Sequence, residues 1–137
     1  MTLTTDTAVT QEHQDIARTV QEYIQQLNAS NARAIVDLYT DDAAFFQPGH
    51  PTAVGSQQLA EVYENAFAGV KVSMSNQIDT IFADGDLAAV RSHSSGSITL
   101  LADGTVVPMA CRELWVLTRS GGGWKIAQYM HQELGQE

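Results

Sequence analysis

The chain has 137 residues, of which 44% are hydrophobic and 17% charged, which suits one globular domain whose core needs no disulfide or metal. Its formal net charge of -9 lacks the positive field that nucleic acid or an anionic membrane requires, so we expect neither as a partner. One cysteine excludes an intrachain disulfide, and neither a signal peptide nor an apolar run of membrane-spanning length is visible, so we expect a cytoplasmic location.

The first part of the chain has the periodicity of helices. Apolar residues at steps of three and four predict a first helix from Thr10, its cap, to Asn28. The apolar residues of this stripe are Ile16, Val20, Ile24 and Leu27. Asn31 is the expected cap of a short second helix, and we expect Asp41-Asp42 to end that helix.

A strand, a loop and a third helix follow. Residues 43–47 predict a short strand, and residues 48–51, Pro-Gly-His-Pro, form a loop because proline and glycine cannot sustain a strand ladder. Ser56 opens the third helix, which ends at Gly69. The first half of the chain therefore supplies three helices and one short strand.

The second half changes to the pattern of strands. Four segments rich in β-branched and aromatic residues are separated by Asp-Gly pairs or three glycines, which are hairpin signals. The segments cover residues 70–83, 87–101, 105–119 and 124–133. We expect an α+β class in which three N-terminal helices pack on one face of an antiparallel meander sheet. Residues 11–134 would form this single domain after a flexible N-terminus, residues 1–10.

Three segments resemble a known superfamily. VQEYIQQLNA, from Val20 to Ala29, and IVDLYTDDA, from Ile35 to Ala43, resemble the opening of bacterial ketosteroid isomerases and of the broader SnoaL-like families. GWKI at residues 123–126, before a final strand, is equally typical of the nuclear transport factor 2-like superfamily. The resemblance implies a cystatin-like cone whose strongly curved sheet curls around the first helix, often as a homodimer.

The resemblance also implies site residues. In the isomerases a tyrosine on the first helix and a protonated carboxylic acid on a later strand hold the substrate oxygen, while an aspartate moves a proton. Tyr23 matches the position of that tyrosine, and Glu113 matches or lies near the position of the acid. The aspartate position holds Gln47, an amide that cannot accept and return a proton near neutral pH. This departure argues against a steroid isomerase of the usual kind.

Two environments are open for Glu113. Cys111 and Trp115 share its strand face, and burial between them would favour the protonated, hydrogen-bond-donating acid. Alternatively, Glu113 forms a buried ion pair with Arg91 on the neighbouring strand. Arg91 and His93 share a face. If that face is concave, as the superfamily register favours, His93 is the best acid/base candidate; if it is convex, both side chains are solvated or lie at a dimer interface.

The expected pocket is mostly apolar. Besides the catalytic candidates Tyr23, Glu113 and His93, the expected ligand-binding residues are Tyr39, Phe45, Gln47, Tyr63, Arg91, Trp115, Gln128 and Met130. On the last strand we favour Gln128 and Met130 over His131 as pocket neighbours. We expect no metal, since the four histidines lack ligand spacing, and no cofactor, since no nucleotide-binding glycine loop is present. Such a pocket suits a small apolar molecule with one or two oxygens.

Two functions remain open. The first is a small-molecule-binding module, whose sheet forms a homodimer through the outward residues Arg112, Leu114 and Val116. The alternative is a cofactor-independent isomerase, cyclase or dehydratase that applies acid/base chemistry to a carbonyl-bearing, polyketide-like or steroid-like substrate. The amide at position 47 favours the first function, and a concave cluster of charged side chains favours the second.

Overall fold

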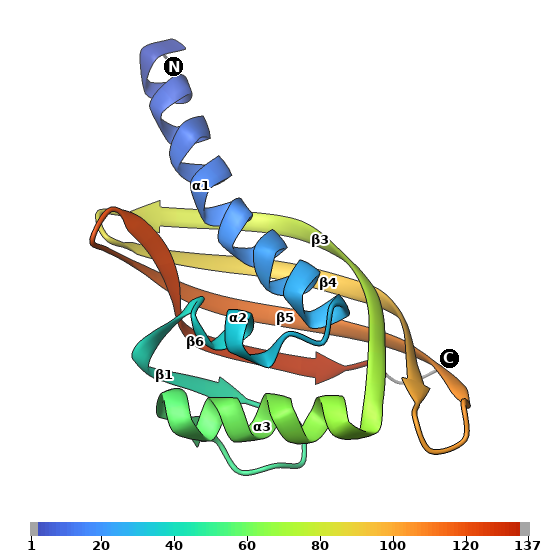
Figure 1. The fold of residues 1–137 in the computed structure, drawn as a ribbon. Coiled ribbons are helices and arrows are strands. Elements are labelled where there is room, and N and C mark those ends of the chain that lie inside the picture. Colours follow the sequence, from blue (N-terminus) through green and yellow to red (C-terminus); the bar gives the residue numbers. More distant parts are fainter. Residues whose placement is uncertain (1–2, 135–137) are drawn as a thin grey trace.

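The structure is a computed structural model that describes residues 3–134, with side chains from residue 11 onward. Three helices pack on the concave face of a curved six-stranded sheet (Figure 1). Two strands of the sheet lie between the second and the third helix in the chain. The expected α+β class, with the helices on one face of a curved sheet, is confirmed. In the part of the chain that is described, no helix is both long and apolar enough to cross a bilayer.

Helix α1 spans Leu3–Asn28 and begins well before its expected start at Thr10. Neither glycine nor proline interrupts the preceding residues, so the helical hydrogen-bond ladder continues toward the N-terminus. Within the segment expected to be flexible, residues 1–10, the helix covers the residues from Leu3 onward, and residues 1 and 2 lie outside the described residues. Flexibility of this segment stays a prediction.

Helix α2, Ala32–Val36, begins at its expected cap. The Asn31 side-chain oxygen accepts a hydrogen bond from the Ala34 backbone N–H at 3.2 Å. Helix α3 spans Gly55–Gly69, close to its expected bounds. Helix α1 contacts β3 and β6, whereas α3 contacts β1, β2 and β3, so the two long helices cover different parts of the concave face.

Strand β1, Tyr39–Phe46, runs parallel to the last strand of the chain. The expectation that Asp41 and Asp42 would end the second helix is wrong, because both lie within β1, exposed to solvent. The reason is tertiary. The Ile126 N–H donates to the Leu38 carbonyl at 2.8 Å and draws the chain into the sheet directly after the helix.

The four long strands form the predicted antiparallel meander. They are β3 (Val70–Asp84), β4 (Leu87–Leu100), β5 (Val106–Ser120) and β6 (Gly123–Glu133). The two-residue strand β2, Ala53–Val54, pairs with β1, and the sheet order is β2-β1-β6-β5-β4-β3. The register shifts in three ladders: at Asp79 on β3, at Ala127 on β6, and between Tyr39 and Ala44 on β1. A bulge adds one residue to a strand, so the residues that face the core switch from even-numbered to odd-numbered positions beyond it.

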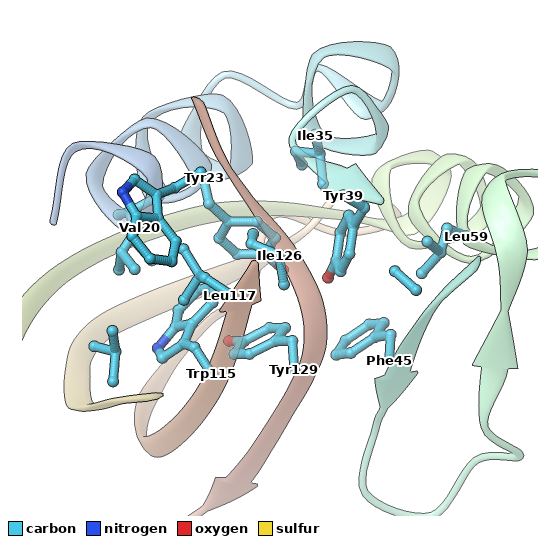
Figure 2. Packing of buried hydrophobic residues seen from close by; sticks show 14 of the residues in the cluster. Val20, Tyr23, Ile35, Tyr39, Phe45, Leu59, Trp115, Leu117, Ile126 and Tyr129 are labelled. Carbon is cyan, nitrogen blue, oxygen red and sulfur yellow. The ribbon is translucent and has the colours of Figure 1, made fainter. Parts of the chain in front are cut away.

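The core lies between the helices and the concave face of the sheet (Figure 2). Tyr23 from α1 meets Trp115 from β5 edge to face, with ring centroids 5.0 Å apart. Trp115 stacks on Tyr129 from β6 at 3.9 Å. These contacts bury large aromatic areas in favourable geometries and fill the interior next to the site described below.

Gly96 on β4 marks a close approach of two strands. A Cβ at this position would lie 2.0 Å from the carbonyl oxygen of Ser73 on β3. Only glycine therefore allows the two strands to pass so close to each other at this point. Met74, which pairs with Gly96, lines the cavity on the concave side.

Candidate functional site

A cavity of about 170 Å³ lies between α1, α3 and the concave face of the sheet. Its walls are mostly apolar and include Ile24, Leu27, Val62, Phe67, Val72 and Met74. Its polar groups are the side chains of Gln47, Ser94, Glu113, His131 and Glu133 and the phenols of Tyr23, Tyr63 and Tyr129. An apolar cavity with a few convergent polar groups is the usual form of a small-molecule site.

The strand register places several polar groups in one row. Glu113 on β5 pairs with Ser92 on β4 and with His131 on β6, so the three lie side by side across the concave face. Directly paired residues hold their Cβ atoms about 4.5–5.5 Å apart. The adjacent row contains Trp115 and Tyr129, both buried. The polar row therefore borders the aromatic core.

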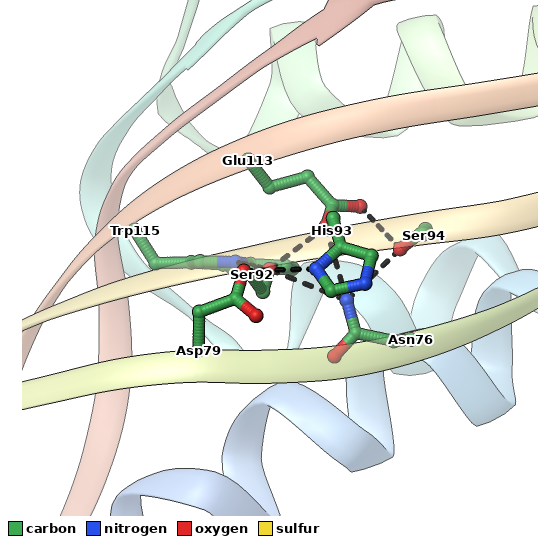
Figure 3. Close-up of polar contacts among 7 residues, drawn as sticks. All are labelled: Asn76, Asp79, Ser92, His93, Ser94, Glu113 and Trp115. Atoms are coloured by element: carbon green, nitrogen blue, oxygen red, sulfur yellow. Dashed lines mark hydrogen bonds and ion pairs between the residues drawn. The ribbon is translucent and has the colours of Figure 1, made fainter.

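Glu113 is buried, and its carboxylate accepts four hydrogen bonds; Figure 3 shows all but the one that Tyr129 Oη donates to Oε2 at 3.5 Å. Ser92 Oγ donates to Oε1 at 2.7 Å, Asn76 Nδ2 donates to Oε1 at 3.0 Å, and Ser94 Oγ donates to Oε2 at 2.7 Å. The Trp115 Nε1–H donates to Ser92 Oγ at 2.9 Å and fixes that hydroxyl in turn. These hydroxyl and amide groups all donate to the carboxyl oxygens of Glu113, and the expectation of a protonated, hydrogen-bond-donating acid at this position stays a prediction.

Arg91 and His93 lie on the convex face, so the expected concave cluster with Glu113 is wrong. Strand alternation turns Ser92 inward and its two neighbours outward, where both are exposed. His93 Nδ1 lies 2.9 Å from Asp79 Oδ2, also exposed. In Figure 3 the His93 ring overlaps the Glu113 network only in projection. The alternative ion pair between Arg91 and Glu113 is likewise absent from the described contacts.

Gln128 and Met130 are also misplaced by the sequence prediction, because both are exposed while Tyr129 and His131 line the cavity. The cause is the bulge at Ala127. Before the bulge the even-numbered residues of β6 face the core, and after it the odd-numbered residues do. The preference for Met130 over His131 as a pocket neighbour is therefore reversed.

His131 is half-buried on the cavity wall. Its ring lies 5.6 Å from the Phe45 ring and 5.8 Å from the Tyr129 ring, centroid to centroid. Burial lowers the pKa of the His131 imidazole below its ordinary value, and the nearby Glu133 carboxylate offsets part of this effect. Among the described side chains and backbone groups, none forms a hydrogen bond with either ring nitrogen. Both nitrogens are therefore available to a ligand.

Three buried phenols form a hydrogen-bonded chain. Tyr63 Oη lies 2.6 Å from Tyr23 Oη and 2.7 Å from Tyr39 Oη. Burial raises the pKa of all three phenols above the ordinary value, so each stays neutral at physiological pH. Each hydroxyl donates only once. When Tyr39 donates to Tyr63 and Tyr63 to Tyr23, the Tyr23 proton is free for a ligand oxygen.

Other predicted ligand residues divide between the cavity wall and the layer behind it. Phe45, Gln47 and Tyr63 line the cavity, whereas Tyr39 and Trp115 lie behind its wall. Tyr39 and Trp115 reach the site through their hydrogen bonds with Tyr63 and Ser92. Contact of any of these residues with a ligand stays a prediction. Within residues 11–134, no three His, Cys, Asp or Glu side chains converge as metal ligands would.

Sequence reasoning missed six polar residues of the site: Asn76, Ser92, Ser94, Tyr129, His131 and Glu133. A signal existed for the serines. Along β4 they alternate with Arg91 and His93, and in a sheet covered on one side the charged set belongs on the solvent face. No comparable signal existed for His131, because the bulge that turns it inward leaves no distinct pattern in the sequence.

A known protein family and several solved structures are similar to this chain. The profile of the SnoaL-like domain family matches residues 20–129. A ketosteroid isomerase-like protein from Erwinia carotovora atroseptica SCRI1043 is 35% identical, with a TM-score of 0.85 over 89% of this chain and 95% of its own. Among curated proteins, none matches this chain in sequence.

Two more distant structures resemble the chain in fold alone. An NTF2-like protein with a cystatin-like fold from Novosphingobium aromaticivorans is 19% identical, with a TM-score of 0.76 over 98% of this chain and 90% of its own. An NTF2-like superfamily protein from Salmonella enterica serovar Typhimurium LT2 is 17% identical, with a TM-score of 0.78 over 90% of this chain and 91% of its own. The expected superfamily resemblance is confirmed.

Proposed function

Because the chain belongs to the SnoaL-like domain family, we propose that it binds a small, mostly apolar molecule with one or two oxygens in the cavity between α1, α3 and the sheet. One observation carries this proposal: a mostly apolar cavity wall also presents the Tyr23 phenol and the unbonded imidazole of His131. Membership in a fold family does not determine the ligand, so we infer the ligand class from the side chains that line this cavity.

The size of the cavity limits the ligand. At about 170 Å³ it is smaller than the roughly 300–1,000 Å³ of sites for drug-sized molecules. One or two fused rings suit this volume better than the four rings of a steroid. We therefore narrow the steroid-like or polyketide-like class, which the resemblance implied, to its smallest members.

The charge of the cavity limits the ligand further. Glu113 and Glu133 lie on its wall, and no arginine or lysine lines it among the described residues. An anionic ligand would face repulsion without compensation. The neutral phenol of Tyr23 and the imidazole of His131 suit a carbonyl or hydroxyl oxygen instead. The proposed ligand is therefore neutral.

Binding of 2-naphthol, a fluorescent two-ring phenol, tests the proposal through its fluorescence anisotropy. Ala66 on α3 lines the cavity, so Ala66→Leu fills part of it and we expect affinity to fall at least about tenfold, or 1.4 kcal/mol. Ala68→Leu is the matched control, because Ala68 is exposed on the same helix. Naphthalene, which lacks the hydroxyl, should bind roughly two- to tenfold more weakly than 2-naphthol. Equal affinity of both leucine variants for 2-naphthol would place binding elsewhere.

Catalysis is the second candidate function. The observation that favours it is that a titratable group without a partner, His131, lines the same cavity as the phenol donor Tyr23. A cofactor-independent isomerase or lyase that acts on a carbonyl compound needs a group that moves a proton and a donor that stabilises the oxygen. The amide at Gln47 cannot take the first of these roles.

We also propose a homodimer formed through the convex face of the sheet. Leu114 and Met130 are 52% and 48% exposed there, with Arg112 beside them. Exposed apolar side chains next to arginine are typical of protein interfaces. A cytoplasmic location likewise stays a proposal, supported by the acidic composition and the single cysteine.

A further inference from the structure

We propose that His131 is the proton-transfer residue of this cavity and accepts a proton from the carbon next to a ligand carbonyl. This inference rests on the proposed binding function and deepens it. It assigns to a residue of β6 the task for which position 47, with its amide, has no suitable group.

Every other titratable group of the cavity is unsuited to this task. The phenols of Tyr23, Tyr63 and Tyr129 are buried, and burial raises the pKa of each well above its usual range. Burial also raises the pKa of the Cys111 thiol to about 11, so this group stays protonated near neutral pH. These four groups can donate a hydrogen bond, but they have no free base form at pH 7.

The two carboxylates are unsuited for other reasons. Glu113 accepts hydrogen bonds from Ser92, Ser94 and Asn76, so donors already occupy its lone pairs. To accept a ligand proton it would have to break these hydrogen bonds, which is costly in a buried site. Glu133 is exposed near the end of β6, where water solvates it. Of the titratable residues that line the cavity, His131 therefore remains as the candidate base.

The position of His131 suits a base. Its ring lies against the rings of Phe45 and Tyr129, which restrict its orientation, while both nitrogens lack partners among the described residues. The titratable groups near it are Glu133 and Tyr129 on β6, Glu113 and Cys111 on β5, Tyr23 on α1 and Tyr63 on α3; β1 and the loop after it contribute only Phe45 and Gln47. No cation lies among them, and burial outweighs Glu133, so the neutral, proton-accepting imidazole prevails at pH 7.

The step balances without a cofactor. The bond between the α-carbon and its hydrogen breaks, and the proton moves to the unprotonated nitrogen of His131. The electron pair of that bond enters the enolate, whose oxygen accepts a hydrogen bond from the Tyr23 phenol. Return of a proton from the imidazolium to carbon restores a neutral ketone and a neutral histidine. In D₂O the half-buried imidazolium releases the abstracted proton to solvent and takes up a deuteron before the return, so the cycle labels the ketone.

Deuterium exchange of 2-tetralone, a two-ring ketone whose enol resembles 2-naphthol, tests the inference. Mass spectrometry measures label uptake in D₂O, and 2-naphthol anisotropy measures binding on the same samples. Wild type should accelerate exchange over buffer, and His131→Gln should lose at least about 100-fold of that acceleration while it still binds 2-naphthol. His93→Gln is the matched control, because His93 is exposed on the opposite face, and it should exchange as wild type does.

The pH profile gives a readout that does not depend on a variant. Exchange by the wild type should rise with pH and reach a plateau above the pKa of His131, which lies below the ordinary histidine value. Exchange by His131→Gln at the wild-type rate, or a wild-type rate that keeps rising through pH 8, would overturn the inference. Binding of 2-naphthol without any exchange would overturn it and leave the proposed binding function intact. Absence of both binding and exchange would overturn both.

Discussion

Replacement of Glu113 by leucine tests the polar network on which the cavity wall depends. Leucine keeps much of the side-chain volume but removes the acceptor of three buried donors, Ser92 Oγ, Ser94 Oγ and Tyr129 Oη. The half-buried Asn76 Nδ2 keeps the hydroxyl oxygens of Ser92 and Ser94 as acceptors. Each donor left without a partner costs about 1–2 kcal/mol, or about 3–6 kcal/mol for the three. Removal of the buried charge avoids its desolvation cost and offsets part of this, so the expected net loss of stability is about 2–4 kcal/mol.

Urea denaturation followed by tryptophan fluorescence measures this loss, since Trp115 and Trp124 are both buried. The mechanism has a second consequence that a simple packing defect lacks. In the Ser94→Ala background one of the orphaned donors is already gone, so Glu113→Leu should cost about 1–2 kcal/mol less there. Glu113→Gln, which keeps one acceptor oxygen in place, should cost less than Glu113→Leu. A Glu113→Leu variant at least as stable as wild type, or full additivity with Ser94→Ala, would refute the reasoning.

Two further predictions concern the sheet. Gly96→Ala places a Cβ 2.0 Å from the Ser73 carbonyl oxygen, so β3 and β4 must separate locally, and stability should fall by about 3 kcal/mol in urea denaturation. Gly69→Ala is the control, because its Cβ meets nothing within 4 Å. Equal stability of the two variants would contradict the close approach of the strands. Sedimentation equilibrium should give about twice the chain mass of 14.9 kDa for the wild type. Leu114→Glu should yield the monomer because it places a charge in the proposed interface, whereas Leu101→Glu, at the exposed turn between β4 and β5, should leave the dimer intact. A monomeric wild type would contradict the proposed dimer.

Local patterns in the sequence determine much of the fold. Three such patterns are the helical stripe around Ile16 and Val20, the Asn31 cap and the Asp-Gly turns. Each depends on interactions between residues a few positions apart, so a short segment of sequence is enough to predict it. The inward direction of Glu113 also followed locally, because Cys111 and Trp115 alternate with exposed neighbours on the same strand. The position of Tyr23 on the buried side of α1 followed from the same stripe.

The tertiary structure alone decided which side chains share the cavity. Alternation fixes that Arg91 and Ser92 face opposite ways, but only the pairing of β4 with β5 shows that the serine stands beside Glu113. The bulge at Ala127 depends on how β6 fits against β5 and β1 together, and it turns His131 inward in place of Met130. Register and bulges arise from contacts between segments far apart in the chain, and such contacts have no signature within either segment.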